Sequence, residues 1–446
     1  MPRKKMPQLM VVSPSSGVGK TMVAVGLMSF LRGKGYEVQP FKCGPDYIDT
    51  KFHEAACGRG SVNLDLFMAP GRHLRDLYGY YCRDASAAVA EGMMGMLDGF
   101  SLYKGSSAQV AECLGLPLLM VVDASRSGFS VCLLLSGFRE YCRESGSTML
   151  GVIFNKVGSD RHKEMLREAA ERSGVKCLGL IPRDMDLERD SRYLGLDFSG
   201  GSLRTDVLSE IIERHVDWQN IIKMSSMECP KWSDPFDRSV PFLEDFRGKR
   251  IAVARNSESF SFIYREHLDL LDRLGDLAFF DPEQNEPLPS GTSLLYIPGG
   301  YPERHVSSLS SSTVSLSSIR DYASNGGRIV AECGGMMYLC KEIETDDGSF
   351  PMSGILPYKI KAGTRDRHLS LGYRQLRLDG NTYRGHEFHY TQFADPTQVS
   401  SACQVYDAKG RPVSSPIIIT KGIMASYTHL YWYSWEMDLH DSSLST

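Results

Sequence analysis

The chain has 446 residues, and at about 100–200 residues per domain this length predicts two or three domains. Hydrophobic residues make up 42% and charged residues 23%, values that are typical of a globular protein and exclude a disordered chain. The 50 basic and 54 acidic residues give a net charge of −4, so we expect no basic surface and no nucleic-acid partner. Eleven cysteines at irregular spacings do not form an extracellular disulfide framework and favour a reducing cytoplasm.

The apolar segments are too short for membrane insertion. Near the start, only Leu9–Val12 are consecutively apolar, whereas a secretory signal needs about 7–15 such residues. The longest run, Leu116–Val122, is far below the roughly 20 residues of a membrane span. We therefore expect a cytoplasmic protein with no membrane partner.

Short apolar runs alternate with helix-like stretches along most of the chain, a pattern that predicts parallel α/β sheets. The pattern breaks between about 196 and 247, where DFSGG (197–201) and a proline-rich stretch (228–241) indicate connecting material, and it resumes at Gly248. We expect two doubly wound α/β domains, 1–200 and 248–440, with a linker at 201–247 and a loosely held tail after Trp435. The expected strands are Leu9–Val12, Val38–Phe41, Leu116–Val122, Met149–Phe154, Ile251–Val253, Leu294–Ile297 and Ile329–Ala331.

A glycine-rich loop, SPSSGVGKT (13–21), lies between the first strand and a helix-like run, Met22 to Leu31. This is the context of a phosphate-binding loop, whose backbone N–H groups cradle phosphates while its lysine reaches the β- and γ-phosphates and its threonine faces Mg²⁺. The chain departs from the G-x-x-x-x-G-K-[ST] pattern at Pro14, and the alternative is a turn that only begins a helix. We expect ATP to contact Ser16, Gly17, Val18, Gly19, Lys20 and Thr21.

Two acidic clusters follow the loop. One, Lys42–Asp49 (KCGPDYID), comes at the carboxyl end of the second strand, where ligands bind in open α/β sheets, and the other is Glu91–Gly99 (EGMMGMLDG). Each cluster alone is typical of a solvated turn, but beside a phosphate loop they predict carboxylates for a Mg²⁺–nucleotide site. Asn155 and Lys156, after the strand at 152–154, are candidates to hold adenine, with an ordinary turn as the alternative.

A second candidate site surrounds Cys333 in the segment VAECGGMMYL, which runs from a strand into a helix-like stretch. A cysteine on such a turn presents its sulfur as a nucleophile, and a helix N-terminus is expected to lower the pKa of its thiol. Backbone N–H groups of Gly299, Gly300 and Gly334 are candidates for an oxyanion site. The candidate bases are His386, His389 and His429.

Together these motifs resemble the cobyrinate a,c-diamide synthase family. The resemblance implies a P-loop domain like dethiobiotin synthetase, joined to a flavodoxin-like class I glutamine amidotransferase domain. It implies glutamine hydrolysis at a Cys–His pair and ATP-driven amidation of the a and c acetates of a corrin, cobyrinate, and it is compatible with a homodimer. The matching segments are SGVGKT (16–21), PFKCGPDYIDTKFH (40–53), NLD (63–65), EGMMGMLDG (91–99), PGGYPE (298–303), AECGGMMYL (331–339), GHEFHY (385–390) and ASYTHL (425–430).

The resemblance also implies individual roles. Cys333 matches the nucleophile and His429 its base, whereas Tyr431 stands where many class I amidotransferases have the glutamate that orients the histidine. The remaining matches concern ATP, Mg²⁺ and activation of the corrinoid. They imply that Lys42 binds the nucleotide. The expected metal ligands are Thr21, Asp46 and Glu91, and the expected catalytic residues of the ATP-dependent step are Asp46, Asp49 and Asp98.

Other functions remain as alternatives. Shared motifs do not separate cobyrinate from hydrogenobyrinate or Ni-sirohydrochlorin. Cobyric acid synthase has the same domain order but a pattern that differs from GPDYID after the second strand. Partitioning ATPases, which use the loop as a switch, carry a second lysine near Ser15. A glutaminase acting alone would leave the acidic clusters unexplained.

Overall fold

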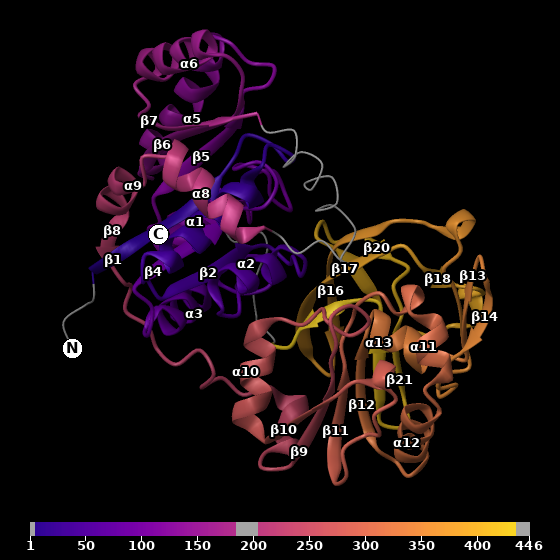
Figure 1. Ribbon diagram of the computed structural model, residues 1–446. Coiled ribbons are helices and arrows are strands. Elements are labelled where there is room, and N and C mark those ends of the chain that lie inside the picture. Colours follow the sequence, from indigo (N-terminus) through magenta and orange to yellow (C-terminus); the bar gives the residue numbers. More distant parts are fainter. Residues whose placement is uncertain (1–4, 184–203, 434–446) are drawn as a thin grey trace. The chain divides into compact units, whose positions relative to one another are not determined.

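The computed structural model describes residues 5–183 and 204–433, and the chain divides into two compact units, Met1–Pro235 and Phe236–Thr446 (Figure 1). The predicted connecting material at 197–201, the first residues of the predicted linker and the tail after Trp435 lie outside the described residues. No helix in the described parts is long and apolar enough to cross a bilayer.

The first unit contains one sheet of parallel strands in the order β3-β2-β4-β1-β5-β6-β7, with β8 antiparallel to the start of β1. The order reverses beside β1, and the carboxyl end of β1 therefore lies at the position where open α/β sheets bind ligands. The strands are β1 (Lys5–Val12), β2 (Val38–Cys43), β3 (Val62–Leu64), β4 (Ala87–Glu91), β5 (Leu118–Asp123), β6 (Met149–Val157), β7 (Cys177–Pro182) and β8 (Ser226–Glu228). The helices are α1 (Lys20–Gly33), α2 (Asp49–Cys57), α3 (Gly71–Cys82), α4 (Ser107–Leu114), α5 (Val131–Ser145), α6 (Asp160–Ser173), α8 (Thr205–His215) and α9 (Trp218–Ser225).

Part of the segment expected as a linker, 201–247, is folded. Helix α8 packs against α1, where Leu208 and Ile212 join the core formed by α1 and β1, and Ile221 of α9 joins the same core. Residues 205–228 therefore complete the first unit, because their apolar side chains cover α1.

The second unit is built on another parallel sheet, in the order β10-β9-β11-β12-β22, with β21 antiparallel at one edge. All predicted strands are present in the two units, which confirms the α/β class. The elements of this sheet are β9 (Arg250–Ala254), β10 (Asp276–Phe280), β11 (Thr292–Ile297), β12 (Arg328–Glu332), β21 (Ile417–Thr420) and β22 (Ile423–Ser426), with α10 (Arg265–Leu274), α11 (Val306–Ser311), α12 (Thr313–Ser324) and α13 (Gly334–Leu339).

Two further sheets complete the second unit, one antiparallel and one that contains a single parallel pair of strands, and the apolar-run pattern does not predict them. Their longest hairpin joins β16 to β17 through Asp379-Gly380, both at positive φ, and an Asp-Gly turn of this kind is the strongest short sequence signal for a hairpin. The strands of these sheets are β13 (Glu342–Thr345), β14 (Gly348–Pro351), β15 (Lys359–Lys361), β16 (Ser370–Leu378), β17 (Asn381–His389), β18 (Gln392–Phe393), β19 (Val405–Asp407), β20 (Pro412–Val413) and β23 (His429–Tyr431).

Candidate active sites

The glycine-rich loop joins β1 to α1, as the sequence predicts. Gly17 and Gly19 have φ of 79° and 92°, values that favour glycine. A Cβ on Gly19 would lie 2.3 Å from the Asn155 side-chain nitrogen, which donates a hydrogen bond of 2.9 Å to the Val18 carbonyl. Asn155 therefore supports the loop from β6, which continues through Asn155 and Lys156 rather than ending at Phe154.

The ammonium group of Lys20, the lysine of this loop, is held by two hydrogen-bond acceptors. Its Nζ donates to the Ser13 hydroxyl at 3.2 Å and to the Met94 carbonyl at 2.9 Å. Burial lowers the pKa of Lys20, and the nearby Glu91 carboxylate opposes that effect. Because both present partners are uncharged, a phosphate oxygen would be a stronger partner for this ammonium group.

A threonine, a glutamate and a histidine form a buried group beside the loop. The Thr21 hydroxyl donates to one oxygen of Glu91 at 2.6 Å, and His53 Nε2 lies 2.7 Å from the other. Burial would raise the pKa of Glu91, but hydrogen bonds from His53 and Thr21 and the charge of Lys42 lower it to about 2. Glu91 is therefore an ionised carboxylate next to the hydroxyl that phosphate loops use for Mg²⁺.

The first acidic cluster lies at the same edge of the sheet, because β2 pairs with β4 and β4 with β1. Lys42 Nζ is buried, 3.6 Å from Asp49 and 3.9 Å from Asp46. Burial alone would lower the pKa of Lys42, but Asp46, Glu91 and Asp49 raise it. Burial, reinforced by the charges of Glu91 and Asp46, raises the pKa of Asp49 well above its usual value. The ammonium group of Lys42 opposes this rise.

The remaining predicted residues of the first unit have local partners. Asp98 accepts a hydrogen bond of 3.0 Å from the Gly95 backbone in its own loop, and Lys156 pairs with Asp123 at 3.0 Å. Residues 5–183 and 204–433 contain no group of three or more His, Cys, Asp or Glu side chains that would hold a metal alone. Mg²⁺ bound with a nucleotide does not require such a group, since phosphates and water complete its coordination.

In the second unit, Cys333 occupies the sharp turn between β12 and α13. Its φ of 48° and ψ of −109° are strained for a residue with a side chain, as in a nucleophile elbow. Gly300 and Gly334 form backbone hydrogen bonds to Cys333, and these favour its thiolate form. Two of the three glycines predicted to form an oxyanion site thus face the sulfur.

The third glycine, Gly299, separates the cysteine from His429. A Cβ on Gly299 would lie 2.2 Å from Cε1 of His429 and 3.1 Å from Cβ of Cys333. The Gly299 carbonyl accepts hydrogen bonds from the backbone of Ser261 and Phe262, at 2.8 and 2.9 Å. The backbone at Gly299 therefore cannot move away from His429 without breaking these hydrogen bonds. The structure therefore brings Cys333 and His429 together across a position where only glycine fits.

The expected lowering of the pKa of Cys333 is wrong for this structure. Burial, together with the charges of Glu303 and Glu387, raises the pKa of the thiol, and burial lowers the pKa of His429 to about 3. Helix α13 has only six residues, which limits the field at its N-terminus. At neutral pH the pair is a thiol and a neutral imidazole, so His429 has to remove the proton as the sulfur attacks.

The other two candidate bases differ in orientation. His386 pairs directly with His429 across β17 and β23, and paired residues present their side chains on one face of a sheet. Strand alternation places Glu387 and His389 on the opposite face, where the His389 ring stacks on Tyr427 at a centroid distance of 3.8 Å. This arrangement places His386 on the face of His429 and His389 on the other.

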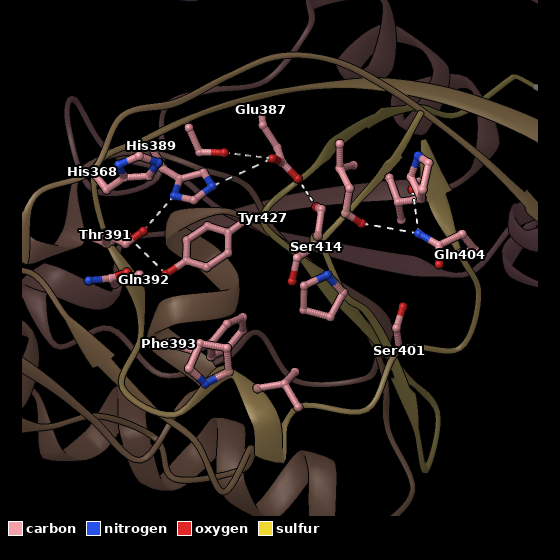
Figure 2. Close-up of a pocket in the computed structure, with 18 of the residues that line it drawn as sticks. His368, Glu387, His389, Thr391, Gln392, Phe393, Ser401, Gln404, Ser414 and Tyr427 are labelled. Carbon is pink, nitrogen blue, oxygen red and sulfur yellow. Dashed lines mark hydrogen bonds and ion pairs between the residues drawn. The ribbon is translucent and has the colours of Figure 1, made fainter. Parts of the chain in front are cut away.

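The face that carries His389 lines a cavity of about 600 Å³, which Figure 2 shows with Glu387 and His389 pointing toward each other. Glu387 pairs with Arg374 at 2.7 Å and accepts a hydrogen bond of 2.8 Å from the Thr428 hydroxyl. Because Thr428 precedes His429, these contacts anchor the strand that carries the candidate base.

Several residues that lie at the two sites had no role predicted from the sequence. His53 and Ser13 contact Glu91 and Lys20, and Glu332 lies 3.9 Å from Nδ1 of His429. His53 and Glu332 are inside quoted motifs, but their contacts depend on residues 38 and 97 positions away. No local pattern encodes such contacts.

Comparisons with known proteins agree with this two-site organisation. Residues 9–195 match the model of the CobQ/CobB/MinD/ParA nucleotide binding domain, and residues 250–437 match that of the CobB/CobQ-like glutamine amidotransferase domain. A hydrogenobyrinate a,c-diamide synthase of Mycobacterium tuberculosis is 35% identical, covering 94% of this chain and 94% of the relative. A cobyrinate a,c-diamide synthase of Caldanaerobacter subterraneus is 33% identical, with coverage of 96% and 95%.

The chain belongs to the cobyrinate and hydrogenobyrinate a,c-diamide synthase family. Its nucleotide-binding and amidotransferase domains fit a ligase that uses ATP and takes nitrogen from glutamine. Another relative with a similar match is a cobyrinate a,c-diamide synthase of Gloeobacter violaceus, 35% identical over 95% of this chain and 93% of its own length.

The lack of space for a side chain at Gly299, between Cys333 and His429, gives a first prediction. We expect Gly299→Ala to lower glutamine hydrolysis by about 100-fold or more, because an added methyl group displaces the buried His429 ring and a misplacement of about 1 Å can cost 10²-fold. The measurement is glutaminase kcat, with ammonia-dependent amidation as a check on the first unit. Gly137→Ala, in helix α5 with open space around it, is the matched control and should leave both activities unchanged. Wild-type glutaminase kcat in Gly299→Ala would contradict the claim that a side chain at position 299 displaces His429.

Proposed function

We propose that this protein amidates the a and c acetate carboxylates of cobyrinate, using ATP and ammonia released from glutamine. The observation that supports this most directly is the presence in one chain of a phosphate loop next to the ionised Glu91 and of Cys333 next to His429. The first site activates a carboxylate, and the second releases ammonia. We further propose that the enzyme works in the cytoplasm, since all its cysteines are free.

In the ATP half-reaction, Lys20 and the loop amides bind the phosphates. Asn155 supports the loop through its hydrogen bond to the Val18 carbonyl. A carboxylate oxygen of the corrin attacks the γ-phosphorus, the bond to the ADP oxygen breaks, and an acyl phosphate forms. Ammonia then displaces phosphate to give the amide. Lys20 stabilises the charge that develops on the transferred phosphoryl group.

We propose that Thr21 and Glu91 hold Mg²⁺ with the nucleotide, and that Asp46 contributes from the loop after β2, the strand that pairs with β4. The Thr21–Glu91 contact of 2.6 Å and the low pKa of Glu91 support this assignment. When bound, the metal neutralises phosphate charge. His53 would keep the Glu91 carboxylate oriented.

We propose that Asp46, Asp49 and Lys42 receive the acetate of the corrin, with Asp98 shaping the loop beside them. Protonated Asp49, whose pKa is raised, donates a hydrogen bond to the substrate carboxylate without repelling it. Lys42, predicted from the sequence to bind the nucleotide, lies beside Asp46 and Asp49, and in this proposal it instead offsets the substrate's negative charge. Lys156, paired with Asp123, remains our candidate for the adenine end of the nucleotide.

In the glutamine half-reaction, Cys333 attacks the side-chain amide carbon while His429 takes the thiol proton. A thioester forms, the carbon–nitrogen bond breaks, and the imidazolium returns the proton to the departing nitrogen as ammonia. We propose that the backbone N–H groups of Gly300 and Gly334, which hydrogen-bond to Cys333, stabilise the oxyanion and that Gly299 leaves space between Cys333 and His429. Water then hydrolyses the thioester to glutamate.

The test is incubation of the full chain with ATP, Mg²⁺, glutamine and a panel of carboxylated tetrapyrroles, with product masses as the readout. Conversion of two carboxyl groups of cobyrinate to amides is expected. If no tetrapyrrole is amidated while glutamine is hydrolysed, the proposal is wrong.

Hydrogenobyrinate is the second candidate substrate, because several relatives with this level of similarity carry that name. The two corrins differ in the central cobalt. Comparing kcat/KM for cobyrinate and hydrogenobyrinate in the same panel decides between them.

A further prediction concerns the proposed metal site. We expect Glu91→Gln to raise the Mg²⁺ concentration for half-maximal amidation by about 10-fold or more, because an amide is a weaker ligand than an ionised carboxylate. Ammonia-dependent amidation, measured over a Mg²⁺ series, checks this. Glu112→Gln, at an exposed position of α4, should behave as the wild type. If the Mg²⁺ concentration for half-maximal amidation is unchanged in Glu91→Gln, Glu91 is not a ligand of the metal.

A further inference from the structure

A buried carboxylate lies beside the base of the second unit. Glu332, the last residue of β12, immediately precedes Cys333, and its Oε2 lies 3.9 Å from Nδ1 of His429. Both side chains are almost fully buried, with 3% of Glu332 and 0% of His429 exposed. Groups this close together and away from water interact more strongly than they would at an exposed surface.

Three donors fix the orientation of this carboxylate. Oε1 accepts hydrogen bonds from the Leu430 backbone at 3.1 Å and from Nε1 of Trp432 at 3.2 Å, and Oε2 accepts one from the Tyr296 hydroxyl at 2.8 Å. The indole of Trp432 is itself held by stacking on His267, with ring centroids 4.0 Å apart. Glu332 therefore cannot turn away from His429 without losing several buried hydrogen bonds.

The two edges of the His429 ring face different groups. The Cβ position built on Gly299 lies 2.2 Å from Cε1 and 3.1 Å from Nε2 of the ring, and 3.1 Å from Cβ of Cys333. The edge with Cε1 and Nε2 thus faces the cysteine, whereas Nδ1 faces Glu332. At 3.9 Å the carboxylate is beyond hydrogen-bonding distance, but it lies on the side from which it could hold Nδ1 protonated and leave Nε2 to act as base.

The position that carries a glutamate in many class I amidotransferases does not supply this carboxylate. It is Tyr431 here, and its hydroxyl donates to the buried Glu266 on α10. Glu332 is contributed by the strand that also positions the nucleophile.

We propose that Glu332 is a positioning residue for His429: its ionised carboxylate accepts the Nδ1–H hydrogen bond and leaves Nε2 to take the proton of Cys333. The inference rests on the proposed function, in which His429 is the base. During attack the proton moves from Sγ of Cys333 to Nε2, the proton on Nδ1 stays in place, and the imidazolium is stabilised by the adjacent carboxylate. The distance of 3.9 Å shortens in this step, as hydrogen bonds of active sites commonly do when substrate binds.

The ionisation state of Glu332 sets the conditions of the test. Burial raises the pKa of Glu332 to about 7, although the hydrogen bonds from Tyr296, Trp432 and Leu430 lower it. Assays at about pH 8 therefore keep most of this carboxylate ionised.

The experiment compares glutamine hydrolysis by the full chain, with ATP and corrin present, in Glu332→Gln and the wild type. We expect kcat to fall by about 10-fold or more, because the base loses the group that sets its tautomer and orientation, with KM for glutamine within about threefold. Glu332→Asp, which restores the charge, should recover part of kcat. Glu266→Gln removes a buried carboxylate near Tyr431 but not beside His429, and it is the matched control, with kcat within about threefold of wild type.

The deciding readout is a double-mutant cycle with His429→Ala. If Glu332 acts only through His429, adding Glu332→Gln to His429→Ala changes the residual rate by less than about twofold. An equal loss in both backgrounds, or an unchanged kcat in Glu332→Gln alone, overturns the inference. If Glu332→Gln does not fold, Glu332→Asp read in both backgrounds makes the same comparison. Wild-type glutaminase activity in His429→Ala would instead overturn the proposed function.

Discussion

Replacing the nucleophile, Cys333→Ser, is expected to abolish glutamine-dependent amidation, with a loss of about 10³-fold or more, while amidation with high ammonia stays within about twofold of wild type. A serine hydroxyl is a much weaker nucleophile than a thiol whose proton a neighbouring imidazole removes. Cys333 belongs to the second compact unit, and the phosphate loop to the first, so the ATP half-reaction does not depend on the sulfur.

The measurement is the rate of amide formation with glutamine and, separately, with an ammonium salt at alkaline pH. Cys403→Ser, at a half-buried cysteine of the same unit, is the matched control and should retain both rates. Loss of both rates in a folded Cys333→Ser protein would contradict the division of labour between the two units.

The second large effect is expected at the phosphate loop. Lys20→Ala removes the ammonium group that faces the phosphate side of the loop, and amidation should fall by about 10²–10³-fold with either nitrogen donor, the usual cost of losing one group that stabilises transition-state charge. Both donors are affected because carboxylate activation precedes the arrival of ammonia.

The readout for this variant is amide formation together with ADP release. Lys34→Ala is the matched control, because Lys34 follows the same helix but is exposed and pairs with Glu213. We expect wild-type rates from it, since exposed ion pairs contribute little. A wild-type ammonia-dependent rate in Lys20→Ala would show that this loop does not bind ATP.

The parts of the two sites that are continuous in sequence could be predicted from the sequence. The loop 13–21 and the turn at Cys333 each combine a strand, glycines and one reactive side chain within about ten residues, and local backbone geometry is enough to form them. The apolar runs likewise predicted seven of the parallel strands, because strands buried on both faces are continuously apolar, but they missed β3, β4, β7, β10 and β22. The hairpin at Asp379-Gly380 carried a local signal too, but its alternating strands differ from the apolar runs that define the parallel sheets.

Only the tertiary structure decided which distant residues are in contact and how burial and neighbouring charges shift their pKa values. Glu91 contacts Thr21 and His53 because β4 lies between β1 and β2. Glu332 faces His429 because β12 pairs with β22, which leads into the segment that carries His429. The sequence predicted a lowered pKa for Cys333, and the structure raises it, because burial and nearby carboxylates outweigh a six-residue helix. Strand order, burial and the pKa values that depend on them arise from contacts between residues far apart in the chain, and no local pattern specifies these contacts.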